Sequence, residues 1–199
     1  MAVRKGAAGR VRIIGGRWKG HRLPVPSAPG LRPTPDRVRE TLFNWLMPWL
    51  GAGEVVDLFA GSGALGFEAA SRGAPRVLLV ERNPRTVAVL RSQCERLPDG
   101  QRVRVEQRDA LRWLREADLS DVTGIFLDPP YGSGLLEAAL DRLRSRALPR
   151  LAWLYLELPS LLDAGVLAQR LPEDFRITRQ GTAGDVGFAL ATRPPADAG

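Results

Sequence analysis

The sequence has almost no cysteine or histidine. Among its 199 residues, Cys94 is the only cysteine and His21 the only histidine. A single cysteine excludes an internal disulfide, and the two residues together exclude a Cys/His zinc site and a multi-cysteine iron–sulfur cluster. A Ser/His/Asp triad is disfavoured because His21 stands among basic residues near the start of the chain. We therefore expect no metal.

Long hydrophobic runs are also absent. A membrane helix needs about 20 consecutive apolar residues, and the best candidate, residues 148–171, is interrupted by charges and a proline. The chain does not open with a charged and then apolar signal peptide, so we expect a cytoplasmic protein without membrane contact. Hydrophobic residues still make up 44% of the chain, enough for the core of one domain with a small appendage.

Lysine is scarce, and the basic charge is concentrated at one end. Only Lys5 and Lys19 are lysines among 29 basic residues. The first 40 residues contain ten basic and two acidic residues, a net charge of +8, which leaves the other 159 residues at −1 of the total +7. An arginine-rich genome would spread arginine along the whole chain. The asymmetry therefore favours an acidic macromolecular partner, most simply nucleic acid.

The N-terminal segment is predicted to form a basic β-hairpin. Residues 11–14 and 21–25 have strand composition, and the glycines between them can form a bulge and a turn. Thr34-Pro35-Asp36 is typical of a helix start, and apolar residues at helical spacing predict a helix that ends at Gly51 and Gly53. We divide the chain into a basic arm and hairpin over 1–33, a main domain over 34–194 and a disordered tail over 195–199.

From residue 54 onward, strand and helix patterns alternate. This repetition predicts an α/β fold: a Rossmann-like, mostly parallel seven-stranded sheet with helices on both faces. One of the last two strands is expected to be antiparallel because only a glycine-rich turn separates them. The expected strands are residues 55–59, 76–81, 103–106, 124–128, 153–158, 175–179 and 186–192.

A glycine-rich loop follows the first of these strands. Its sequence is Asp57-Leu-Phe-Ala-Gly61-Ser-Gly63-Ala-Leu-Gly66, and glycines between a strand and a helix let the backbone approach a ligand. Glu81 ends the next strand, where its carboxylate can accept hydrogen bonds from two ribose hydroxyls. These features predict an adenosine-containing cofactor. Asp57 would repel a pyrophosphate and attract an ammonium, which favours S-adenosylmethionine over NAD.

The third strand is followed by Asp109, which can accept from the adenine amine or cap the next helix. The sequence leaves both roles open. The residues expected to bind the cofactor are Asp57, Phe59, Ala60, Gly61, Ser62, Gly63, Glu81, Arg82, Asp109 and Ala110.

The fourth strand ends in Asp128-Pro129-Pro130-Tyr131, at the edge where open α/β sheets bind ligands. An exocyclic amine of a base is a poor nucleophile because its lone pair is delocalised into the ring. Asp128 and the carbonyl of Pro129 can accept its two N–H groups and orient the lone pair, while Tyr131 can stack on the base. The motif predicts methylation of a base amine with Asp128, Pro129 and Tyr131 as catalytic residues.

These two motifs resemble the class I amino-methyltransferases with a (D/N)-P-P-(Y/F) signature. Residues 12–20, 23–26 and 30–44 are in addition similar to the bacterial RsmD family, and the likeness covers about residues 10–192. The resemblance implies methylation of the 2-amino group of one guanine in 16S ribosomal RNA. The RNA would be presented in the assembled or assembling small subunit. We expect the protein to act as a monomer.

The resemblance also gives roles to the N-terminal region. It implies that Thr34 and Arg37 help to close over the cofactor. It implies too that the hairpin holds RNA, with Trp18 either stacking on a base or packing the hairpin against the main domain. The residues expected to bind RNA are Arg12, Arg17, Trp18, Lys19 and Arg22.

Three other functions are compatible with parts of the pattern. Adenine N6-methylation of DNA uses the same four-residue motif. Sequence-specific DNA enzymes usually carry a separate recognition domain, however, and 199 residues leave no room for a large one. A dinucleotide-dependent oxidoreductase would leave Asp57 and the motif at Asp128 without a role. A non-catalytic RNA-binding assembly factor would have no need of intact motifs.

Overall fold

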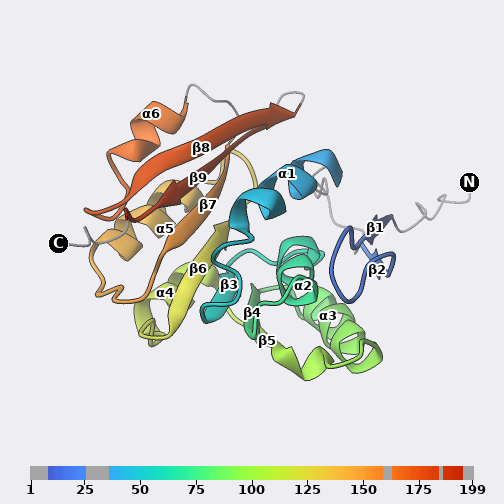
Figure 1. The fold of residues 1–199 in the computed structure, drawn as a ribbon. Helices are drawn as coiled ribbons and strands as arrows, with labels where there is room; N and C mark the ends of the chain where they lie inside the picture. Colours follow the sequence, from blue (N-terminus) through green and yellow to red (C-terminus); the bar gives the residue numbers. More distant parts are fainter. Residues whose placement is uncertain (1–8, 26–35, 159–162, 184–185, 195–199) are drawn as a thin grey trace, which may run out of the picture.

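A seven-stranded sheet dominates the computed structural model, which describes residues 9–25, 36–158, 163–183 and 186–194 (Figure 1). Five parallel strands are followed at one edge by two antiparallel pairings, since β9 runs against both of its neighbours. This confirms the predicted mixed sheet. In spatial order the strands are β5 (Val103–Gln107), β4 (Arg76–Glu81), β3 (Glu54–Asp57), β6 (Val122–Leu127), β7 (Trp153–Leu158), β9 (Val186–Thr192) and β8 (Arg176–Ala183).

Helices cover both faces of the sheet, so the central strands are apolar on both sides (Figure 1). Alternate strand residues divide into two cores. The first core packs the sheet against α4 (Ala110–Glu116), α5 (Leu135–Arg144) and α6 (Asp163–Ala168). The second packs it against α1 (Asp36–Leu46), α2 (Ala64–Ser71) and α3 (Pro84–Arg96).

Local sequence signals explain several boundaries. Asn83 caps α3 by accepting a hydrogen bond from the N–H of Arg85, with Pro84 in the first turn, as predicted. The expected end of α1 at Gly51 is wrong, because the helix stops at Leu46. Pro48 accounts for the difference, since it offers no N–H and disfavours helical backbone in the residue before it. The predicted cap at Thr34 lies outside the described residues.

The predicted N-terminal hairpin is present and packs beside α2 and α3 (Figure 1). Strands β1 (Arg10–Arg12) and β2 (Arg22–Pro24) pair antiparallel. Ile13, Trp18 and Leu23 are buried in the same core as α1 to α3. At Gly16, a positive φ of 75° and the carbonyl of Ser71, 2.0 Å from where a Cβ would lie, leave room for glycine alone.

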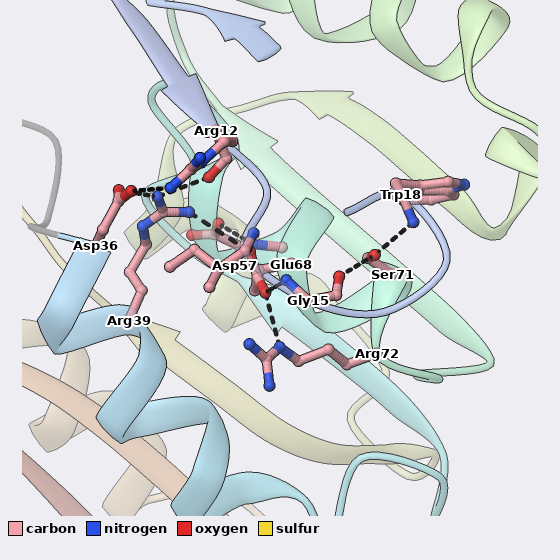
Figure 2. Close-up of polar contacts among 11 residues, drawn as sticks. Arg12, Gly15, Trp18, Asp36, Arg39, Asp57, Glu68, Ser71 and Arg72 are labelled. Carbon is pink, nitrogen blue, oxygen red and sulfur yellow. Dashed lines mark hydrogen bonds and ion pairs between the residues drawn. The ribbon is translucent and has the colours of Figure 1, made fainter. Parts of the chain in front are cut away.

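A buried ion pair fastens the hairpin to the main domain (Figure 2). Glu68 on α2 is fully buried and accepts hydrogen bonds from the N–H groups of Ile14 and Gly15 at 2.7 and 2.8 Å. Arg39 on α1 is equally buried, lies 3.6 Å from Glu68 and donates to the carbonyl of Arg12. The hairpin is therefore attached through charged groups that water does not reach.

Within the described ranges, no helix is long and apolar enough to cross a membrane.

Candidate active site

Acidic residues stand at the carboxyl ends of five adjacent strands. Glu81 ends β4, Asp57 ends β3, Asp109 and Asp128 follow β5 and β6, and Glu157 lies near the end of β7. All five line one cavity of about 310 Å³, and we call them the acidic row. Parallel strands bring their carboxyl ends to the same edge of a sheet, which explains why residues distant in sequence meet here.

The glycine loop forms the floor of this cavity beside β4. Gly63 precedes α2 with a φ of 75°, and a Cβ there would lie 2.7 Å from the ring of Phe67. The carboxylate of Glu81 accepts the N–H of Gly61 at 3.1 Å and that of Asn83 at 2.7 Å. Glu81 thereby holds the loop against the end of β4 and is itself fixed in orientation.

Asp57 is a buried carboxyl group at the centre of the row. One of its oxygens accepts the N–H of Gly66 in the first turn of α2 at 3.0 Å. Burial raises the pKa of Asp57 to about 7, an effect that Glu81 strengthens and that the N–H groups of Gly66 and Phe59 oppose. A cation in the cavity would favour the ionised carboxylate, so this position suits an ammonium group.

Asp128 and Glu157 lie side by side next to Asp57. Leu127 and Leu156 are paired across β6 and β7, and Asp128 and Glu157 are the residues that directly follow them. Burial and the charges of Glu157 and Asp57 raise the pKa of Asp128 well above its usual range. The negative charge of Glu157 opposes ionisation of Asp128, because two neighbouring carboxylates repel each other.

Two tyrosines hold Glu157. The hydroxyl of Tyr131 donates to one carboxylate oxygen at 2.7 Å, and the hydroxyl of Tyr155 donates to the other at 3.4 Å. Tyr131 is otherwise half exposed at the cavity mouth, where its ring is available to a ligand. Asp128, Pro129 and Tyr131 therefore come together in one wall as the sequence predicted.

The cavity contains most of the predicted cofactor residues. Asp109 also caps α4 by accepting from the N–H of Arg112 at 2.9 Å, which confirms the capping role. Gly63 shapes the loop without lining the cavity, and Arg37 is exposed on α1 away from it. Thr34 lies outside the described residues. The predicted residues that line the cavity are Asp57, Phe59, Ala60, Gly61, Ser62, Glu81, Arg82, Asp109, Ala110, Asp128, Pro129 and Tyr131.

Sequence reasoning missed several other lining residues. Glu157 carried a signal, because it is the single charge within the apolar strand Trp153–Leu158. Thr86 and Arg108 had no comparable signal, since Thr86 reaches the cavity from the first turn of α3 and Arg108 from the turn after β5. The additional lining residues are Leu58, Ala64, Leu65, Val80, Asn83, Thr86, Arg108, Pro130, Leu135 and Glu157.

The hairpin presents exposed cations, with one correction. Arg12, Arg17, Lys19 and Arg22 are all exposed, but Arg12 forms an ion pair with Asp36 and Arg17 forms one with Asp99. The sequence left two roles open for Trp18, and the structure shows packing rather than a ring free to stack on RNA. Its indole is buried against Phe67, and its N–H donates to the carbonyl of Pro98 at 2.9 Å, so the ring packs the hairpin onto the main domain.

In the described part of the chain, no group of three or more His, Cys, Asp or Glu residues is arranged to hold a metal ion.

The sheet order, the glycine loop and the acidic row define a class I S-adenosylmethionine-dependent methyltransferase. Residues 11–192 match the family described as "Conserved hypothetical protein 95". The chain belongs to this family, which is the RsmD family of ribosomal RNA methyltransferases.

Relatives support this membership over nearly the whole chain. Ribosomal RNA small subunit methyltransferase D of Escherichia coli is 40% identical over 187 residues, which are 94% of this chain and 91% of the relative. The enzyme of the same name from Haemophilus influenzae is 39% identical over 189 residues, 92% and 94% of the two chains. The solved structure of the Escherichia coli protein yhhF has a TM-score of 0.80 at 37% identity and covers 93% of this chain and 98% of its own.

Proposed function

We propose that the protein transfers a methyl group from S-adenosylmethionine to the exocyclic N2 amine of one guanine in 16S ribosomal RNA. The observation that carries this proposal is the position of Asp128 and Pro129. They supply two hydrogen-bond acceptors in the same cavity as the glycine loop and Glu81. Family membership favours RNA over the DNA and oxidoreductase alternatives.

The cavity residues fit S-adenosylmethionine. Asp57 offers a buried carboxylate to the ammonium of its methionine part, and Glu81 offers acceptors at the strand end where the ribose hydroxyls would lie. Asp109 would accept from the adenine amine. A row of five carboxyl groups disfavours a pyrophosphate. When bound, the cofactor supplies an electrophilic sulfonium methyl group.

The chain's own residues orient the amine. Asp128 and the Pro129 carbonyl each accept one N–H of the guanine 2-amino group, which directs the nitrogen lone pair toward the methyl group. A carboxylate is far too weak a base to ionise this amine beforehand. The N–H proton becomes acidic only as the nitrogen–carbon bond forms, and Asp128 then accepts it.

The hairpin supplies the RNA-binding surface in this proposal. Arg12, Lys19 and Arg22 are exposed on a segment that is fixed to the main domain by the Glu68–Arg39 pair. Cations on such a surface bind phosphates and set the position of the RNA. The arm and hairpin over 1–33 would thus serve the domain over 34–194. We propose that the enzyme acts in the cytoplasm as a monomer on the assembled or assembling small subunit.

Transfer of tritium from labelled S-adenosylmethionine tests the proposal. Small subunits from a strain lacking this methylation, protein-free 16S RNA and adenine-rich DNA are incubated separately with the protein. We expect one methyl group per small subunit and none on DNA. Label on DNA alone, or on no nucleic acid, contradicts the proposed function.

Replacing Glu81 with alanine is expected to weaken cofactor binding by about 1–3 kcal/mol, the scale of lost charge-assisted hydrogen bonds. Part of this loss comes from the loop, because the N–H of Gly61 loses its partner. Titration calorimetry measures the change. Glu95→Gln, on the exposed side of α3, is the control and leaves the affinity unchanged. An unaltered affinity in Glu81→Ala contradicts the assignment of the ribose site.

Cofactor affinity is expected to increase about fivefold between pH 6 and pH 7, because the pKa of Asp57 is about 7 before binding. Below that pH, the carboxyl group must lose a proton to pair with the ammonium. Above about pH 8, the affinity falls again as the amine of the cofactor loses its own proton. Calorimetry across this range measures both limbs. Asp57→Asn is expected to bind the cofactor more weakly and to show no rise in affinity between pH 6 and pH 7. If the variant still shows that rise, another group is responsible for it.

Lys19→Ala and Arg22→Ala together are expected to flatten the salt dependence of RNA binding by roughly one unit of log–log slope for each residue. Filter binding of small-subunit RNA at several salt concentrations measures the slope. Arg112→Ala, an exposed arginine of α4 on the opposite face of the sheet, keeps the slope of the unaltered protein. Equal slopes in all three proteins contradict the hairpin as the RNA-binding element.

A further inference from the structure

Glu157 is a buried carboxyl group that neither the motif nor the cofactor site explains. Its side chain is 7% exposed, yet it lines the cofactor cavity and also a second cavity of about 410 Å³. The two cavities share Pro129, Pro130, Tyr131 and Glu157. A base that reaches Asp128 from the second cavity would therefore pass directly over Glu157.

The orientation of Glu157 is fixed before any ligand binds. Tyr131 and Tyr155 donate hydroxyl protons to its two oxygens. Asp128 lies at the corresponding position of the adjacent parallel strand. A carboxylate oxygen accepts more than one hydrogen bond, so an oxygen held by a tyrosine can still accept from a ligand. Three acceptors thus stand side by side: Asp128, the Pro129 carbonyl and Glu157.

The bases that carry an exocyclic amine differ in the atom beside it. On the Watson–Crick edge, the amine of guanine is followed by the N1–H donor, whereas the amines of adenine and cytosine are followed by an acceptor nitrogen. A fixed carboxylate next to the amine site attracts an N–H group and repels a nitrogen lone pair. Because unpaired buried polar groups are costly, such a group discriminates strongly between these edges.

We propose that Glu157 accepts the N1–H of the target guanine and so selects guanine among the amine-bearing bases. This inference rests on the proposed function and deepens it. Asp128 and the Pro129 carbonyl accept hydrogen bonds from the two N–H groups of the amine. Glu157 accepts one from N1–H, the third donor of the same edge. Tyr131 and Tyr155 hold the carboxylate of Glu157 in place for this contact.

A matched pair of substrates tests this role. Small subunits are reconstituted with RNA that carries either guanine or 2-aminopurine at the target position. The analogue keeps the 2-amino group, replaces the N1–H with a lone pair and lacks the 6-oxygen. Glu157→Gln is compared with the unaltered protein and with Glu95→Gln, which makes the same change of charge on exposed α3.

We expect Glu157→Gln to methylate guanine about 10²-fold more slowly and to lose most of the preference for guanine over 2-aminopurine, since the amide can donate to N1. Its calorimetric affinity for S-adenosylmethionine stays within about twofold of that of the unaltered protein, because Glu157 is not assigned to the cofactor. Glu95→Gln retains the rate and the preference of the unaltered protein.

The pH profile gives an independent readout. The groups that face Asp128 are Glu157 and Tyr155 from β7, Asp57 from β3 and Tyr131 from its own loop. Removing the charge of Glu157 lowers the pKa of Asp128, so the acidic limb of the methylation rate moves to lower pH in Glu157→Gln.

Two results overturn the inference. One is an unchanged preference in Glu157→Gln at the full rate. The other is an equal loss on both substrates, which is the result of a purely structural role. If the unaltered protein methylates no guanine-containing subunit, that result refutes the proposed function rather than the role of Glu157.

Discussion

Asp128→Ala is expected to slow methylation by roughly 10²–10⁴-fold, the range for loss of a positioned polar group at the reacting atom. The alanine removes the acceptor that orients the amine and receives its proton. The fold and the cofactor site remain, because the partners of Asp57 and Glu81 are other residues. Single-turnover transfer to small subunits measures the rate, and calorimetry shows that cofactor affinity changes far less.

Asp128→Asn separates orientation from charge. The amide oxygen still accepts one N–H of the guanine amine, so the variant retains more activity than Asp128→Ala. The amide does not titrate, whereas the pKa of Asp128 is raised well above its usual range, so the variant shows a weaker pH dependence of the rate. If the asparagine variant is as inactive as alanine while folded and cofactor-bound, a negative charge is required and general-base catalysis replaces the orientation mechanism.

Glu68→Ala is expected to destabilise the protein by about 3–5 kcal/mol, the cost of breaking a buried ion pair by removing one member. Arg39 would keep its ion pair with Asp36 but lose the buried one with Glu68, and the N–H groups of Ile14 and Gly15 would lose their acceptor. Arg72 loses its ion pair with Glu68 as well (Figure 2). Denaturant unfolding followed by circular dichroism measures the difference in free energy of unfolding.

Two controls belong to this measurement. Asp121→Ala removes exposed ion pairs with Arg76 and Arg150 and costs less than about 1 kcal/mol. The double variant Arg39→Met/Glu68→Gln loses less stability than the sum of the two single variants, because both single changes break the same Arg39–Glu68 contact. A loss below about 1 kcal/mol in Glu68→Ala contradicts the buried pair as the attachment of the hairpin.

The sequence predicted the order of the elements because local residues mark where many of them begin or end. Asn83 and Pro84 begin α3, Asp109 caps α4, and the glycine loop opens α2. Hydrophobic alternation distinguished strands from helices. Local signals also misled in one place, where the apolar spacing through Trp49 extended α1 beyond the stop that Pro48 imposes.

Contacts between elements that are distant in the sequence could not be predicted from local sequence signals. The burial of Trp18 depends on Phe67 and Pro98, and the pair of Glu68 with Arg39 joins two helices through a segment that precedes both. Glu157 belongs with Asp128 only because β6 and β7 are adjacent in register. Motif residues could be found by spacing, whereas these required the topology of the sheet.

The nucleoside formed in the small subunit tests the proposed chemistry most directly. Undermethylated subunits are incubated with the protein and S-adenosylmethionine carrying a deuterated methyl group, and the RNA is digested and analysed by mass spectrometry. The expected product is N2-methylguanosine with the deuterium label at a single position, formed far more slowly with Asp128→Ala. Label in methylated adenosine or cytidine, or on guanosine at a ring nitrogen, would contradict the assignment of Asp128, Pro129 and the acidic row to a guanine amine.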